Sequence, residues 1–400
     1  MQVTLNELLY SLSQALDFIE KELLGITTNH GKRAAYVSSR LCKATNMSDA
    51  DIADMACCAI LHDNALTSYM LEAGPQGVRQ FERFESHCRR GEENIRDFPF
   101  AGDPKNTILH HHENWNGTGF HNLAGADIPQ RAAFLRLADN MDLHLRMGDG
   151  RHGLIGEIRE HAERHKGTLY SPQAVDTLCG LVDETFISDL SDANIDAALD
   201  RIVPEVPMRL TPKQVMPVCN IFAVIIDAKS PFTQNHSVGV AYRAGMLGTI
   251  LGFDEERKDK LILAGYLHDV GKLSTPLEIL EKPGKLSEEE FAVMQRHAAV
   301  TEEILSAVEG LEEISLWAAS HHEKLNGSGY PHSSADSQIP LEARVLACCD
   351  IYQALTEERP YRTGMPGAKA LDIMEEMAAS GELDPGLVAV MRQNSAMFGA

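Results

Sequence analysis

The sequence predicts an all-α protein built from two tandem helical bundles. Apolar residues recur at the helical spacing i, i+3, i+4, alternating runs typical of strands are scarce, and one pattern of histidines and aspartates occurs twice. The helical spacing is clearest in five segments, which cover residues 6–22, 34–43, 49–61, 255–267 and 288–307.

Two of these segments begin with a helix-capping pattern. Ser48 precedes the acidic stretch 49–51, and Ser287 precedes the acidic run 288–290. A serine followed three residues later by an acidic residue forms a capping box, in which each side chain binds the backbone amide of the other residue. We therefore expect helices to begin at residues 49 and 288.

The proline-bearing stretch 204–212 predicts the junction between the two bundles. We accordingly place one domain at residues 1–205 and the other at 206–400. The segment 214–227, which follows the junction, is apolar nearly all round. This pattern is typical of a helix packed between domains or subunits, so the segment is a candidate homodimer contact.

The composition limits the partners and the compartment. A chain of 400 residues can form two domains, and its net charge of −22 disfavours duplex nucleic acid while leaving room for a small anionic ligand. The eight cysteines include no C-x-x-C motif, so we expect reduced and mostly buried thiols. There is no signal-peptide pattern and no apolar run long enough to span a bilayer, so we expect a cytoplasmic protein without a membrane partner.

The most informative feature is a set of seven metal-ligand residue types that occurs once in each half. In both copies, 32 residues separate the lone histidine from a His-Asp pair, and 24 residues separate the third histidine from a His-His pair. The first copy consists of His30, His62, Asp63, His87, His111, His112 and Asp139. The second copy consists of His236, His268, Asp269, His297, His321, His322 and Asp350.

The second copy has the ligands for a two-metal hydrolase. Imidazole and carboxylate together suit divalent transition metals such as Fe, Mn, Zn or Ni, and seven ligands are more than one ion needs. If the pair lies on a helix, Asp269 points about 100° away from His268 and can bridge two ions. Two neighbouring ions can hold a bridging hydroxide and clamp the oxygens of an in-line phosphoryl displacement. The pattern therefore predicts hydrolysis of a phosphate ester.

The residues around these ligands resemble those of a known family. Residues 268–272 read HDVGK, which resembles the signature of the HD phosphohydrolases, and 321–331 read HHEKLNGSGYP, which resembles the extended motif of the HD-GYP family. Three further segments continue the likeness: 339–344, 350–355 and 359–362. The resemblance covers residues 215–395. It implies HD-domain-like helical bundles and a metal-dependent phosphodiesterase that opens a bacterial cyclic dinucleotide, either cyclic di-GMP or 3′,3′-cyclic GMP-AMP.

The resemblance also implies how the ligands are divided between two ions. One ion would be held by His236, His268, Asp269 and Asp350. The second would be held by Asp269, His297, His321 and His322. Some members of the family bind a third ion through a glutamate, but Phe232 stands at that position here, so we expect two. Fe or Mn is favoured by the family, and Ni or Zn also fits the ligand types.

Other residues are expected to act on the substrate or to shape the site. The catalytic set comprises His268, Asp269 and Lys272. The phosphate-contacting set comprises Lys272, Lys324, Arg344, Arg359 and Arg362, whose cationic groups suit phosphate oxygens. Lys272 would hold a non-bridging oxygen or assist the leaving group. Gly327, Gly329, Tyr330 and Pro331 are expected to shape the loop, and Glu323 is expected to orient a ligating histidine.

The first copy keeps every ligand type but has lost groups expected to handle the phosphate. Leu66 stands where the second copy has Lys272, and Gly148 stands in place of Arg359. The other replacements are Asn114 for Lys324, Phe120 and His121 for Tyr330 and Pro331, and Ala133 for Arg344, while Arg151 matches Arg362. We interpret residues 1–205 as a degenerate HD domain, regulatory or structural, and expect residues 206–400 to carry catalysis.

Two other functions stay open at this point. One is a nucleotidase or phosphomonoesterase acting on linear nucleotides. The other is a non-catalytic module that binds a cyclic dinucleotide and signals through protein contacts; the intact Lys272 and the complete ligand set argue against it. The favoured reaction yields a linear dinucleotide, which a second cleavage would convert to mononucleotides.

Overall fold

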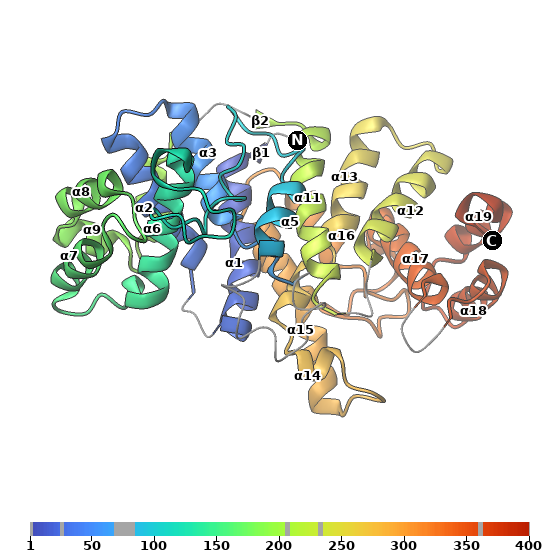
Figure 1. Cartoon of the computed structure of the whole chain (residues 1–400). Coiled ribbons are helices and arrows are strands. Elements are labelled where there is room, and N and C mark those ends of the chain that lie inside the picture. Colours follow the sequence, from blue (N-terminus) through green and yellow to red (C-terminus); the bar gives the residue numbers. More distant parts are fainter. Residues whose placement is uncertain are drawn as a thin grey trace. The chain divides into compact units, whose positions relative to one another are not determined.

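The structure, a computed structural model, describes residues 3–24, 28–67, 85–204, 209–230, 235–358 and 363–399. These residues form two compact units (Figure 1). The N-terminal unit is Asn6–Met208, and the C-terminal unit is Arg209–Ala400 together with Met1–Leu5. The predicted boundary at residue 205 stays a prediction.

Helices dominate both units, which confirms the predicted all-α class. Within the described residues, strands occur only as a short antiparallel pair, β1 (Val3–Thr4) with β2 (Arg209–Leu210). Val3 lies opposite Leu210, and both side chains are buried. This pair belongs to the C-terminal unit.

The N-terminal unit is organised around α2, which packs against α3, α6 and α10. Its core is formed by apolar side chains such as Ala34, Tyr36, Met55 and Phe134. The helices of this unit are α1 (Leu5–Leu24), α2 (His30–Ala44), α3 (Asp49–Ile60), α5 (Glu85–Asn94), α6 (Gln130–Leu145), α7 (Leu154–His165), α8 (Pro172–Leu181), α9 (Glu184–Asp189) and α10 (Ile195–Ile202), with 3-10 turns η2 (Gly125–Asp127) and η3 (Met147–Asp149).

The C-terminal unit is organised in the same way around α12, which packs against α13, α17 and α11. Its helices are α11 (Pro212–Asp227), α12 (His236–Ile250), α13 (Glu255–Leu267), α14 (Leu277–Leu280), α15 (Glu288–Ser306), α16 (Glu312–Ala319), α17 (Leu341–Thr356), α18 (Gly367–Ala379) and α19 (Pro385–Gln393), with 3-10 turns η4 (Val270–Ser274), η5 (Asp336–Gln338) and η6 (Ser395–Phe398). Figure 1 shows α12 and α13 running side by side.

The helices predicted from spacing are present, and both predicted caps are confirmed. Ser48 Oγ accepts a hydrogen bond from the backbone amide of Asp51 at 3.2 Å, and the Asp51 carboxylate accepts one from the Ser48 amide. Ser287 and Glu290 make the same reciprocal pair, with distances of 3.2 and 2.7 Å. Each box satisfies two amide donors that the first helical turn would leave without partners.

The apolar helix α11 lies within its own unit. Val215, Val218, Phe222 and Ile225 are all buried there, and α11 packs against α12, α13 and η4. Because these neighbours already cover the apolar side chains, the expected homodimer contact through residues 214–227 receives no support.

Two further expectations concern thiols and membranes. All eight cysteines are free thiols, and every one except Cys179 is buried, as predicted. No helix in the described part of the chain combines the length and the apolar character needed to cross a bilayer.

Candidate metal centres

The candidate ligands of the C-terminal unit come from separate helices and meet at one place. His236 is the first residue of α12, His297 lies within α15, and Asp350 lies within α17. The expectation that the His-Asp pair lies on a helix was wrong, because α13 ends at Leu267 and His268 and Asp269 form the turn into η4.

The seven side chains form two groups that share Asp269. In the first group, ligand atoms of His236, His268 and Asp350 lie within 4.8 Å of one another. In the second, the same holds for Asp269, His297, His321 and His322. Asp269 Oδ2 is 3.1 Å from His268 Nε2 in the first group, whereas Oδ1 is 3.5 Å from His297 Nε2 in the second. The two oxygens of one carboxylate therefore face different groups, which is the arrangement a bridging ligand requires.

The backbone fixes which ring nitrogen three of these histidines present. His268 Nδ1 lies 2.8 Å from the carbonyl of Gly265, and His321 Nδ1 lies 2.6 Å from that of Ala318. His297 makes the same contact with the carbonyl three residues earlier, at 2.7 Å. A carbonyl oxygen can only accept, so Nδ1 carries the proton and Nε2 presents a lone pair to the group.

His236 is oriented differently, by a side chain that the sequence did not point to. Its Nδ1 lies 3.0 Å from Glu357 Oε2, and its Nε2 lies 3.1 Å from Asp350 Oδ1. Burial would lower the pKa of His236, but its bonds to Asp350 and Glu357 outweigh burial and raise the pKa to about 10. Glu357 lies on the turn that follows α17, and no spacing rule links it to His236.

These residues fit a pair of divalent cations. The Nε2 atoms of His268, His297 and His321 and Oδ1 of Asp269 are buried and make no hydrogen bond within the described structure. Buried polar atoms without partners are costly, and the pair of cations would satisfy all four. Burial lowers the pKa of His297 to about 4 and that of His321 to about 3, so both rings are neutral and can donate lone pairs.

Lys272 reaches the shared carboxylate. Its ammonium lies 2.5 Å from Asp269 Oδ2, and its side chain is 21% exposed, so it stands at the edge of the site. Burial alone would raise the pKa of Asp269, but the neighbouring charges of His268 and Lys272 hold that pKa well below its usual range. Asp269 is therefore anionic.

Of the other residues expected to contact phosphate, Lys324 and Arg344 make contacts away from the candidate metal ligands. Lys324 Nζ forms an ion pair with Glu382 at 2.6 Å. The Arg344 guanidinium donates to the carbonyls of Ile339 and Asp336, at 2.9 and 2.8 Å, and so holds the loop around η5. Arg359 and Arg362 lie outside the described residues, as does Phe232. A substrate role for these residues stays a prediction.

The loop after the His-His pair is built by close backbone approaches. A Cβ on Gly329 would stand 2.5 Å from the Cα of Glu323, so only glycine fits there, and Gly327 has a φ of 76°. The Tyr330 ring packs against His322, with ring centroids 4.7 Å apart. The expectation for Glu323 was wrong: its carboxylate accepts the backbone amides of His332 and Ser334, at 2.6 and 2.9 Å, and ties the loop instead of a ligand.

Comparison with known proteins agrees with this geometry. The family model described as HD domain matches residues 27–143, and a second HD-domain model matches residues 220–387. The 3′3′-cGAMP-specific phosphodiesterase 1 of Vibrio cholerae is 32% identical over 410 residues, covering 99% of this chain and 93% of that protein. This chain belongs to the HD-GYP family of phosphodiesterases. Each of its halves carries one HD domain.

Two further proteins are similar to the HD-GYP chain. The crystal structure of a cyclic GMP-AMP-specific phosphodiesterase of V. cholerae superposes with a TM-score of 0.67 at 25% identity, covering 98% of both chains. The cyclic di-GMP phosphodiesterase PA4108 of Pseudomonas aeruginosa is 32% identical over 214 residues, or 52% of this chain and 50% of that protein.

The N-terminal HD domain repeats the first ligand group of the C-terminal domain. Ligand atoms of His30, His62 and Asp139 lie within 4.8 Å of one another and are buried. His30 Nδ1 is 2.8 Å from Asp142 Oδ2, so Asp142 orients His30 as Glu357 orients His236 in the other domain. The Asp142 carboxylate also accepts a hydrogen bond from Arg33 at 2.8 Å.

The N-terminal HD domain departs from this pattern at three positions. Leu66, at the position of Lys272, is buried and apolar. At the position of Arg359, a Cβ on Gly148 would stand 2.6 Å from Arg33 Nη1, so no larger side chain fits without moving that buried arginine. In the second ligand group, Cys88 joins the three histidines in place of the aspartate, a residue that we had interpreted as a buried thiol only.

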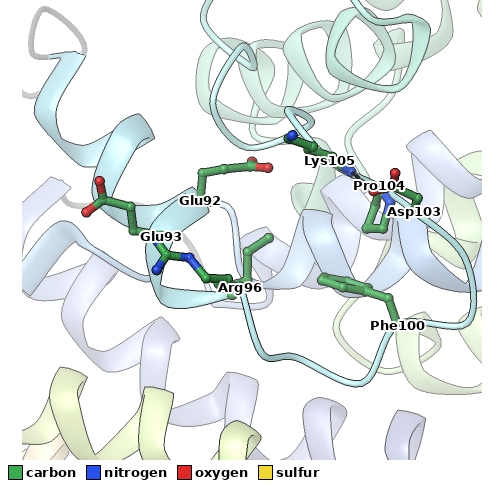
Figure 2. A pocket seen from close by; sticks show the side chains of 8 residues that line it. Glu92, Glu93, Arg96, Phe100, Asp103, Pro104 and Lys105 are labelled. Atoms are coloured by element: carbon green, nitrogen blue, oxygen red, sulfur yellow. Dashed lines mark hydrogen bonds between the residues drawn. The ribbon is translucent and has the colours of Figure 1, made fainter.

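The N-terminal HD domain also has a pocket of about 340 Å³ (Figure 2). It is lined by the end of α5 and the loop that follows, namely Glu92, Glu93, Ile95, Arg96, Phe100, Asp103, Pro104 and Lys105. None of the candidate metal ligands is among these residues, so we assign the pocket no part in the metal chemistry.

Proposed function

We propose that the C-terminal HD domain hydrolyses a phosphodiester bond of a cyclic dinucleotide, with 3′,3′-cyclic GMP-AMP as its preferred substrate. The observation that carries this proposal is the pair of ligand groups joined by Asp269, with the Lys272 ammonium at the edge. The substrate preference rests on the relative that matches both HD domains along the chain, whose name specifies 3′3′-cGAMP. The named cyclic di-GMP phosphodiesterase matches only about half of this chain.

In this proposal, His236, His268 and Asp350 would hold one divalent ion, and His297, His321 and His322 would hold a second, with Fe or Mn favoured over Ni and Zn. Asp269, whose two oxygens face the two groups, would be a ligand shared by both. Such ions would supply Lewis acidity for water and for the phosphate oxygens. The Nδ1 contacts of His268, His297 and His321 keep their Nε2 lone pairs directed into the site, so these ligands need little reorganisation when the ions bind.

Lys272 then acts on the substrate. Its ammonium already lies beside an anionic oxygen of Asp269, and a bound cation at that oxygen would repel it. Displaced from Asp269, the ammonium can hold a non-bridging phosphate oxygen at the open edge of the site or give a proton to the leaving oxygen. Arg359 and Arg362 are proposed to hold the second phosphate.

We do not propose the phosphomonoesterase or the purely binding alternative. A binding module has no need of the shared carboxylate or of Lys272 at its edge. The N-terminal HD domain, with Leu66 and Gly148 at the corresponding positions, is proposed to have a structural or regulatory role without turnover.

The test is turnover of 3′,3′-cyclic GMP-AMP and of cyclic di-GMP by the full chain loaded with Mn²⁺. We expect the His268→Ala, Asp269→Ala double variant to lose hydrolysis. The matched N-terminal variant, His62→Ala with Asp63→Ala, should keep most of it. Equal activity of the first double variant and the wild type would refute the site, and faster turnover of cyclic di-GMP would refute the substrate preference.

A further inference from the structure

The second ligand group of the N-terminal HD domain has a different chemistry from its counterpart. Ligand atoms of His87, Cys88, His111 and His112 lie within 4.8 Å of one another, and all four residues are buried. In the C-terminal domain the fourth member of the group is a carboxylate, Asp269, and the position of Cys88 is occupied by an alanine. Asp63 remains at the position of Asp269, and Cys88 adds a buried thiol that the C-terminal group lacks.

We propose that His87, Cys88, His111 and His112 form a closed tetrahedral site for one zinc ion. Imidazole and thiolate are both zinc ligands, and four of them can close a tetrahedral site, while the thiolate disfavours hard ions such as Mg²⁺ or Mn²⁺. With Zn–N of about 2.05 Å and Zn–S of about 2.3 Å, tetrahedral angles put a ligating nitrogen and sulfur about 3.6 Å apart. Cys88 Sγ and His87 Nε2 lie 3.4 Å apart.

His111 gives the second, independent indication of a ligand. Its side chain is fully buried, and its Nδ1 lies 2.6 Å from the carbonyl of Ile108, so Nδ1 carries the proton. Its Nε2 is buried and makes no hydrogen bond within the described structure. The ring is edge-on to His87, at 5.4 Å between centroids, and adjacent to His112, at 4.1 Å. The lone pair of Nε2 is thus directed into the group, with nothing else there to satisfy it.

The Arg136 side chain must move when the ion binds. Arg136 Nη1 lies 3.4 Å from His112 Nδ1, and a donor at that nitrogen favours the proton on Nε2, the wrong tautomer for a ligand. The contact between Arg136 Nη1 and His112 Nδ1 is long. Arg136 Nε and Nη2 already donate to the Asn114 side-chain oxygen, at 3.3 and 3.2 Å. Binding therefore requires a small rotation of Arg136 onto Asn114.

The ligand set explains why this site would not hydrolyse phosphate. A zinc ion with four protein ligands has no open position for water, which is the difference between structural and catalytic zinc sites. The zinc ion would hold α5 to the loop that bears His111 and His112.

The experiment uses cobalt as a spectroscopic probe of the full chain. Metal-stripped protein is loaded with Co²⁺, and the near-ultraviolet charge-transfer absorption of a thiolate–cobalt bond is recorded. We expect this absorption in the wild type, its complete loss in Cys88→Ala, and its retention in Cys42→Ala, a control that removes a buried thiol of the same domain. Bound zinc should fall by one ion per chain in Cys88→Ala only.

A second readout of Cys88→Ala separates loss of the ligand from a general loss of folding. Hydrolysis by the C-terminal domain should be unchanged in Cys88→Ala, because its ligands are in the other unit. The proposal is overturned if the cobalt-loaded wild type lacks the thiolate absorption or if Cys88→Ala retains it.

Discussion

Replacing Glu357 by glutamine removes one negative charge behind His236 while keeping the size of the side chain. The carboxylate is 7% exposed, lies 3.0 Å from His236 Nδ1, and also accepts a hydrogen bond from Gln353 at 3.2 Å. Outer partners of ligating histidines are worth about 10–100-fold in metal affinity. This corresponds to about 1.4–2.7 kcal/mol at 1.36 kcal/mol per decade, close to the roughly 1.5–3 kcal/mol of a charged hydrogen bond.

The loss should depend on pH, because protons compete with the metal for His236. Burial lowers the pKa of His236, but the bonds to Asp350 and Glu357 outweigh it and raise the pKa to about 10. Without the charge of Glu357 the ring releases its proton more easily, which offsets part of the lost affinity at neutral pH. The difference between variant and wild type is therefore expected to grow as the pH rises from 7 towards 10.

The assay is calorimetric titration of Mn²⁺ into metal-stripped protein at pH 7 and pH 9, with turnover measured at limiting and saturating metal. Glu358→Gln removes the same charge from the exposed neighbouring position and is the matched control. Affinities within twofold of the wild type at both pH values would show that Glu357 does not orient His236. A turnover defect that persists at saturating metal would show that Glu357 acts on the substrate instead.

Four further outcomes are expected. Lys272→Leu, which introduces the residue of the N-terminal copy, should lower kcat by about 10²–10³-fold with metal content unchanged. An unchanged kcat would show that Lys272 only forms an ion pair with Asp269 and does not act on the substrate. Metal affinity should fall as the pH falls below about 10, by about tenfold per unit for the proton that His236 must release, and a flat titration would contradict its raised pKa. Ser287→Ala should lower the free energy of unfolding by about 1 kcal/mol, measured by denaturant titration, because α15 loses its cap. Gly329→Ala should reduce turnover while helix content stays constant, because the added methyl would meet the backbone beneath the loop.

Local sequence patterns were sufficient to predict the helices, their caps and the candidate metal ligands. The capping box of Ser287 needs only residues within one turn, and apolar spacing along 255–267 needs only one face of one helix. The ligands could be placed because the two copies share their spacing, and a repeated interval is visible without knowledge of the fold. The structure then brings all seven residues of the second copy together in two groups.

Residues whose roles depend on distant loops could not be predicted. Glu357 is separated from His236 by most of the domain, and the Glu323 carboxylate turns to the backbone of its own loop instead of a ligand. Arg344 likewise uses its donors on two carbonyls of the preceding loop. Cys88 could have been noticed in the sequence, because a His-Cys pair at 87–88 stands where the other copy has His297 followed by alanine. That difference is recognisable only by aligning the copies outward from their ligands.

The pairing of β1 with β2 has a consequence for the order in which the chain folds during synthesis. Val3 and Thr4 are made before the whole N-terminal unit, yet their partners, Leu210 and Arg209, are made after it. Closing so long a loop from an unfolded chain carries an entropic cost that grows with its length, whereas a unit that is already folded has brought its own ends together. Early folding of the N-terminal HD domain on the ribosome would therefore shorten the effective loop that must close before β1 and β2 can pair.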